Sequence, residues 1–207
     1  MSEDRLTNDR SDRTSEQHRA TKESAIEVRL DLDGSGETDV STGLPFFDHM
    51  LSQLGKHGGV DLSIMTRGDL HVDAHHSVED TGIVLGTALR EAFGNKAGIR
   101  RFASISVPLD EALVEVALDI SGRPYLLYAI DFAPDTLALG SPPFDPQLAE
   151  EFWRALVQAA EVTLHISCTY GKNTHHILEA SFKAVGRALR DAKSVEGCAI
   201  PSTKGLL

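Results

Sequence analysis

Two five-residue segments of the chain carry the same set of side chains that commonly bind divalent metals. The first segment is HHSVE at residues 75–79, and the second is HHILE at residues 175–179. On an α-helix, residues four apart share a face, whereas adjacent residues point about 100° apart. The first histidine of each segment therefore lies beside its glutamate, and the second points elsewhere. We infer two metal ions, each held by pieces of both halves of the chain or of neighbouring subunits.

A third group of candidate ligands precedes the first segment. His49, Gln53 and His57 are spaced at i, i+4 and i+8, which predicts one polar stripe on an otherwise apolar helix. Lys183 extends the second segment into a similar stripe. Nitrogen and carboxylate ligands without thiolates suit Mn, Fe, Co or Ni as well as Zn, and the sequence does not choose among them. The alternative is a pair of helices that were duplicated with their surface residues intact.

The elements that must position these side chains occur in a repeated order. Period-2 alternation predicts strands and 3.6-residue periodicity predicts amphipathic helices. In the first half we expect a strand at 26–32, a helix at 45–57, a strand at 60–72 and a helix at 75–94. In the second half we expect a hairpin at 102–121, a strand at 123–132, a helix at 145–160, a strand at 162–170 and a helix at 174–192.

An internal duplication explains this order. Residues 75–92 and 175–192 align without a gap and match at 8 of 18 positions, where about one match is expected by chance. We predict an α+β fold of two ββαβα-type halves, whose helices pack on antiparallel or mixed sheets. We place the halves at about 21–98 and 99–195, a flexible arm at 1–20 and a tail at 196–207.

Composition narrows the classes of partner. The formal net charge is −11 and the isoelectric point is about 5.2, which argues against nucleic acid or an anionic membrane as the main partner. The two cysteines, Cys168 and Cys198, are too few for a disulfide framework. No apolar run approaches the roughly 18 residues that span a bilayer, and the N-terminal residues resemble neither a secretory signal nor a transit peptide. We expect a cytoplasmic protein.

A set of motifs from residue 21 onward resembles the imidazoleglycerol-phosphate dehydratase family. The matching segments stand in the family's order and spacing: TKES, LDGSG, GLPFFDHML, GDLHVDAHHSVEDTGIVLGTAL, GIRRFA, PLDEAL, DISGRPYL, TLHI, GKNTHHILEASFKAVGRALRDA and IPSTKG. The resemblance implies a lyase of histidine biosynthesis that dehydrates D-erythro-imidazole glycerol phosphate to imidazole acetol phosphate. It also implies a homo-oligomer of 24 subunits, with two Mn²⁺ ions per active site at subunit interfaces.

The resemblance assigns roles to individual residues of this chain. The implied metal ligands are His49, His75, His76, Glu79, His175, His176 and Glu179. The implied substrate-binding residues are Glu23, Gln53, His57, Arg101, Arg123, Lys183, Ser202, Thr203 and Lys204, of which the last three and the two arginines would bind the phosphate. We assign Glu23 a proton-transfer role. Glu151 departs from the family, which usually has histidine there; a glutamate would make the metal's coordination harder and more anionic.

The chemistry explains why two metals would be needed. The proton to be removed lies on a carbinol carbon and is barely acidic, so the substrate's own imidazole ring must act as the electron sink. Two divalent ions, one on each ring nitrogen, would bind the ring as imidazolate, which could then expel the hydroxyl. A dimetal phosphohydrolase with the same ligands is the alternative enzyme, and phosphate release would reveal it. A metal-storing or metal-sensing assembly is the non-enzymatic alternative, but it gives the phosphate-binding residues no role.

Overall fold

The computed structural model describes residues 13–207 of the chain, and its elements fall into two similar halves. The first half contains β1 (Thr14–Ala20), β2 (Ser24–Asp31), β3 (Thr38–Ser41), α1 (Pro45–Gly58), β4 (Asp61–Gly68) and α2 (His75–Phe93). The second half contains β5 (Phe102–Leu109), β6 (Ala112–Asp119), β7 (Tyr125–Ala129), α3 (Leu148–Ala160), β8 (Thr163–Tyr170) and α4 (Thr174–Ala192). The predicted α+β duplication is confirmed.

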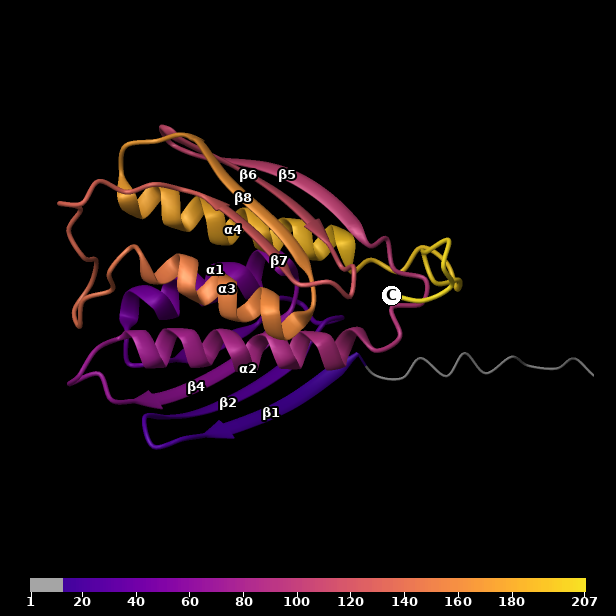
Figure 1. Cartoon of the computed structure of the whole chain (residues 1–207), viewed down its shortest axis with the longest axis horizontal. Coiled ribbons are helices and arrows are strands. Elements are labelled where there is room, and N and C mark those ends of the chain that lie inside the picture. Colours follow the sequence, from indigo (N-terminus) through magenta and orange to yellow (C-terminus); the bar gives the residue numbers. More distant parts are fainter. Residues whose placement is uncertain (1–12) are drawn as a thin grey trace, which may run out of the picture.

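Each half builds one four-stranded mixed sheet. The strand orders are β1-β2-β4-β3 and β5-β6-β8-β7, with one parallel pair in each sheet, β3 with β4 and β7 with β8. In Figure 1 the two sheets form the outer layers and the helices lie between them. Strand residues alternate between buried and exposed positions, because one face of each sheet packs on helices and the other faces outward. The apolar core therefore lies between the two sheets and is built from the inward faces of the strands and from the helices, which also carry most of the candidate ligands.

Helix ends are set by local chemistry. Pro45 occupies the first turn of α1, where a missing N–H costs nothing, and Gly59 ends the helix in the left-handed conformation (φ 57°). The side chain of Asn173 caps α4 by accepting hydrogen bonds from the backbone N–H groups of His175 and His176. This cap fixes the first turn of α4, so the second histidine pair begins on an ordered helix.

The structure corrects two expectations about the N-terminal region. Residues 14–20, which we predicted to be part of a flexible arm, form β1, which pairs with β2 in antiparallel register from Thr14↔Asp31 to Ala20↔Ala25. The remainder of the predicted arm, 1–12, lies outside the described residues. The short strand β3 was also missed, so each half is βββαβα rather than ββαβα. No helix among residues 13–207 is long and apolar enough to cross a membrane.

Candidate active site

The helices α1 and α4 bring three predicted ligands together. His175 Nε2 lies 2.9 Å from a carboxylate oxygen of Glu179, and His49 Nε2 lies 3.4 Å from the same oxygen. The ligand atoms of these three residues all fall within 4.8 Å of one another, and within residues 13–207 they form the one group of three or more such side chains with this spacing. The His175–Glu179 pair follows from i, i+4 spacing, whereas His49 arrives from a separate helix.

The polar stripes beside this group also meet. Gln53 bridges its stripe, with its amide nitrogen 3.4 Å from His49 Nδ1 and its amide oxygen 3.2 Å from His57 Nε2. Lys183 Nζ lies 2.7 Å from the second oxygen of Glu179, so the first oxygen stays directed at the histidines. Burial opposes ionisation of Glu179, but hydrogen bonds with Lys183 and His175 outweigh it and lower the pKa to about 2. Glu179 is therefore an anion at neutral pH.

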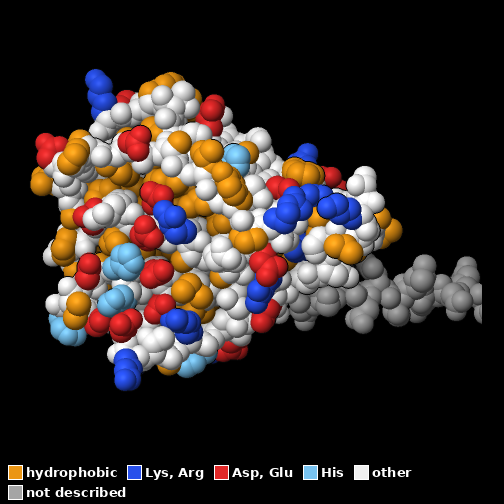
Figure 2. Space-filling model, viewed as in Figure 1, with side chains coloured by type: hydrophobic (Ala, Val, Ile, Leu, Met, Phe, Trp, Pro, Cys, Tyr) orange, Lys and Arg blue, Asp and Glu red, His pale blue; other side chains and the backbone are white. Residues whose placement is uncertain are grey.

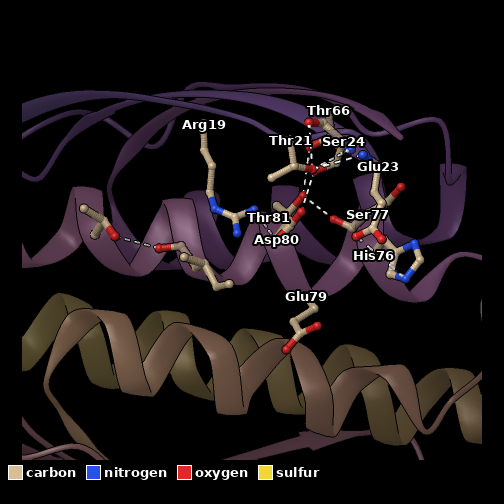
Figure 3. Close-up of polar contacts among 12 residues, drawn as sticks. Arg19, Thr21, Glu23, Ser24, Thr66, His76, Ser77, Glu79, Asp80 and Thr81 are labelled. Carbon is tan, nitrogen blue, oxygen red and sulfur yellow. Dashed lines mark hydrogen bonds and ion pairs between the residues drawn. The ribbon is translucent and has the colours of Figure 1, made fainter. Parts of the chain in front are cut away.

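The helices α2 and α3 form the counterpart of this group in the other half. His75 Nε2 lies 3.5 Å from a Glu79 oxygen, again at i, i+4. Figure 3 shows Glu79 on the face of α2 that is directed toward a neighbouring helix. Glu151, on α3, occupies the position that corresponds to His49 when the repeats are superposed 102 residues apart. Its carboxylate lies 3.5 Å from Nε of Arg154, and within residues 13–207 it belongs to no three-residue ligand group.

His176 is held by a carboxylate that sequence reasoning missed. Its Nδ1 lies 2.7 Å from an oxygen of Glu111, in the turn between β5 and β6, and its Nε2 lies 3.8 Å from Asp110. The hydrogen bond from His176 is the main reason that the pKa of Glu111 falls to about 2, and the same bond raises the pKa of His176. A carboxylate on Nδ1 fixes the ring and leaves Nε2 as the ligand atom.

His76 has an equivalent but looser arrangement. Its Nδ1 lies 3.2 Å from both oxygens of Asp69, and its Nε2 lies 4.0 Å from Glu23. The hydrogen bond to Asp69 is the main cause that raises the pKa of His76. Glu23 and Glu111 occupy corresponding hairpin turns, 88 residues apart, so the duplication was the signal that could have found Glu111.

A partly buried polar network positions Glu23 (Figure 3). The Thr21 hydroxyl accepts hydrogen bonds of 3.1 Å from the backbone N–H groups of both Glu23 and Ser24. The Ser24 hydroxyl bonds in turn to Asp80 of α2, which also pairs with Arg19 of β1. The turn that carries Glu23 is thus tied to the same helix that carries the first histidine pair.

The predicted phosphate-binding residues line one pocket of about 800 Å³. Arg101 donates from Nε and Nη2 to Asp119 at 2.7 and 3.2 Å, and from Nη1 to the carbonyl oxygen of Pro201. Arg123 lies 3.6 Å from Asp119, donates from Nη1 to the carbonyl oxygen of Ser121 at 3.3 Å, and is 65% exposed. The other predicted residues of this pocket are Ser202, Thr203 and Lys204.

The histidine groups and the phosphate pocket lie at opposite ends of α4. His175 is in its first turn, whereas the backbone N–H of Arg101 donates to the carbonyl of Ala192, its last residue. At 1.5 Å per residue, this helix of 19 residues separates the two sites by roughly 25 Å. Figure 2 shows histidine and acidic side chains at one end of the molecule and a gathering of Lys and Arg near the C-terminal segment.

The fold and site define a class of duplicated α+β protein, with histidine–carboxylate groups at one end and a cationic pocket at the other. The family model "Imidazoleglycerol-phosphate dehydratase" matches residues 42–189. The chain is 53% identical over 197 residues to an imidazoleglycerol-phosphate dehydratase of Frankia casuarinae, covering 94% of this chain and 99% of the relative. It is 55% identical over 198 residues to one of Gluconacetobacter diazotrophicus, covering 94% and 98%.

A crystal structure of imidazoleglycerol-phosphate dehydratase from Staphylococcus aureus has the same fold. Its TM-score is 0.77 at 37% sequence identity, over 88% of this chain and 99% of that one. The chain therefore belongs to the imidazoleglycerol-phosphate dehydratase family, whose members are hydro-lyases of histidine biosynthesis.

Proposed function

We propose that this protein dehydrates D-erythro-imidazole glycerol phosphate to imidazole acetol phosphate with two Mn²⁺ ions per active site. The observation that carries the proposal is the group formed by His49, His175 and Glu179, flanked by the Gln53–His57 stripe and by Lys183. Family membership supports the reaction, and the chemistry of the donor set supports the metal.

The residues present fit a divalent ion. Two imidazole nitrogens and a carboxylate oxygen converge between α1 and α4, and the carboxylates on the Nδ1 atoms of His76 and His176 orient those rings for ligation through Nε2. The remaining proposed ligands are His75, His76, Glu79 and His176. When bound, divalent ions would lower the pKa of the substrate's ring N–H and so make the ring electron-rich enough to expel the hydroxyl.

The chain itself supplies positioning and proton transfer. Glu23, held over α2 by its turn and 57% exposed, would take the proton from the carbinol carbon. Gln53 and His57 offer an amide and an imidazole to the substrate's hydroxyls. The pKa of His57 is lowered, first by burial and then by the charge of Lys183, so this ring stays neutral near pH 7. A neutral imidazole can both donate and accept a hydrogen bond, which suits a hydroxyl partner.

The proposed active site needs more than one chain. The substrate is far shorter than the roughly 25 Å between the histidine groups and the phosphate pocket, so one chain cannot bind both of its ends. Within residues 13–207, no hydrogen bond, ion pair or ring contact joins the first HHxxE segment to the second. Both observations support a homo-oligomer with shared sites, which the resemblance puts at 24 subunits. Light scattering on the purified protein measures this number.

We place the reaction in the cytoplasm, without nucleic-acid or membrane partners. Both cysteines are free thiols, as expected in a reducing compartment, and the net charge of −11 disfavours polyanionic partners.

A product assay tests the reaction. Purified protein supplied with Mn²⁺ and imidazole glycerol phosphate should form the ketone without releasing inorganic phosphate, and chelation of the metal should abolish turnover. Release of phosphate would instead identify a dimetal hydrolase. Turnover that is unaffected by chelation would refute the metal dependence.

A further inference from the structure

Lys96, in the loop after α2, is a buried cation that the proposed mechanism does not use. The residue is only 5% exposed, and its backbone has a φ of 59°. Positive φ is uncommon for a residue with a side chain, and burial of an ammonium group without a partner is costly. Both features indicate that the surrounding structure imposes this conformation on Lys96, as is common for residues at functional sites.

The Lys96 ammonium lies behind the phosphate pocket. Gly122 lines that pocket, and a Cβ added to Gly122 would lie 3.3 Å from Lys96 Nζ. A side chain at position 122 would therefore contact the ammonium of Lys96. The backbone carbon of Leu207, which also lines the pocket, would lie closer still, at 2.8 Å, so only glycine, which also adopts a φ of 70° here, fits between the pocket and the ammonium.

Nearby acidic side chains are already engaged by arginines. The acidic groups that act on Lys96 electrostatically are Glu161 and Asp119. Arg90 lies 3.0 Å from Glu161, and Arg101 binds Asp119 through two nitrogens. Within residues 13–207, no carboxylate lies within 4.0 Å of the Lys96 ammonium. An anion in the pocket would supply the missing counter-charge.

We propose that Lys96 is a phosphate-binding residue, whose ammonium acts past Gly122 on the phosphate monoester of the substrate. The identity of this ligand rests on the proposed function. Asp119 offsets much of the charge of Arg101, so the pocket needs another cation to balance a dianion. A lysine suits this place, because it acts as a compact point charge and does not need the bidentate geometry of arginine.

The test measures binding of two probes to the full-length protein. Inorganic phosphate reports on the pocket, and 1,2,4-triazole reports on the histidine end. Lys96→Met should weaken phosphate binding about tenfold and raise KM about as much, because one charge interaction is lost. Triazole binding and kcat should stay within about twofold. The unfolding temperature should stay the same or rise, because an unpaired buried charge is removed.

Three further variants keep the proposal falsifiable. Lys96→Arg retains the charge and should bind phosphate within about threefold of the parent protein. Lys96→Gln removes the charge and should behave like Lys96→Met, and it serves if the methionine variant does not fold. Lys56→Met removes an exposed lysine of α1 and should change neither probe. Unchanged phosphate binding in both neutral variants would overturn the proposal, as would an equal loss of phosphate and triazole binding.

Failure of the reaction and failure of the role of Lys96 give different results. If the protein shows no dehydratase turnover but the neutral variants lose phosphate binding, the role of Lys96 stands and the proposed reaction falls. If turnover is normal and phosphate binding is unaffected, the reaction stands and the role of Lys96 falls.

Discussion

The helix pairs α1–α4 and α2–α3 are two copies of one packing arrangement. In each pair a glycine of the HHxxE helix lets the partner backbone approach closely. A Cβ on Gly186 would lie 2.8 Å from the carbonyl oxygen of Leu54, and one on Gly86 would lie 2.5 Å from that of Leu156. The duplication therefore preserved the close contact between each HHxxE helix and its partner helix.

The chemistry beside the two contacts is different. Gln53 and His57 of α1 correspond to Ala155 and Ala159 of α3, and Lys183 of α4 corresponds to Ile83 of α2. Within residues 13–207, only the α1–α4 pair thus combines a three-residue group that could hold a metal with the polar side chains of Gln53, His57 and Lys183, while the α2–α3 pair has apolar residues at the corresponding positions. A shared scaffold can thus keep the same helix packing in both halves while the polar side chains beside it differ.

Loss of a first histidine is expected to give the largest effect. His175→Ala removes a proposed ligand from the group formed by His49, His175 and Glu179. It should reduce metal binding and turnover together by at least about a hundredfold, because loss of a direct ligand costs more than loss of a residue that only orients a ligand. His75→Ala should likewise reduce metal binding and turnover together. Metal analysis and turnover measured on the same samples check both. His18→Ala, at an exposed position of β1, is the control, and full metal occupancy in either variant would contradict the ligand assignment.

Local periodicity accounts for the parts of the fold that the sequence predicted. The helices were found because apolar stripes, Pro45 and closing glycines mark them. The strand β1 was missed because its sequence, TSEQHRA, is polar and carries no apolar alternation. It is an edge strand that is stabilised by pairing with β2, and Arg19 links it to Asp80 of α2. Such tertiary contacts leave no local pattern.

The same limit applies to the candidate site. Helical spacing predicted the contact of each first histidine with its glutamate, and both contacts are present. Spacing alone could not show that His49 meets His175, because these residues lie on helices far apart in the chain. It also could not reveal Glu111, which comes from a turn between strands.

Removal of the carboxylate beside a second histidine is expected to be the next largest effect. Glu111→Gln should weaken metal binding by about 10- to 100-fold, because His176 loses the partner that orients its ring. Asp69→Asn should have a smaller effect on the His76 side, where the contact is 3.2 Å rather than 2.7 Å. Metal titrations of both variants compare the loss of metal affinity on the His176 side with that on the His76 side. A larger loss in Asp69→Asn than in Glu111→Gln would contradict the expected order.

Replacement of Glu151 tests whether the two helix pairs can be made alike. Glu151→His places at position 151 the residue type that His49 provides in the other pair, so metal binding at the α2–α3 pair should gain about tenfold in affinity for Zn²⁺ or Co²⁺, which favour nitrogen ligands. Glu150→His, one position earlier on α3, is a matched control. Equal titration curves for Glu151→His and the parent protein would show that position 151 does not contribute to metal binding.

The smallest expected effect concerns corresponding residues at the start of β4 and β8. Asp61 accepts hydrogen bonds from the backbone N–H groups of Ser35, Gly36 and Glu37, and the bond from Glu37 is the main cause that lowers its pKa. The hydroxyl of its counterpart, Thr163, donates a hydrogen bond to the carbonyl of Arg123 and shares another with the hydroxyl of Ser121, so this contact involves no charged group. Asp61→Asn should therefore reduce the free energy of unfolding by about 1 kcal/mol at pH 7, and Thr163→Val by less.

The pH dependence of the free energy of unfolding shows whether the charge of the Asp61 carboxylate, rather than its shape, stabilises the fold. Because its folded pKa lies below the ordinary 3.8, the ionised group stabilises the fold above about that pH. This contribution is lost as the pH falls through the folded pKa, since a protonated carboxyl resembles the amide of asparagine. Denaturant unfolding of the parent protein and of Asp61→Asn should be measured from pH 7 down to pH 3. The difference between their free energies of unfolding should shrink as the pH falls. A difference that stays constant with pH would show that the carboxylate charge is not what holds the 35–37 loop.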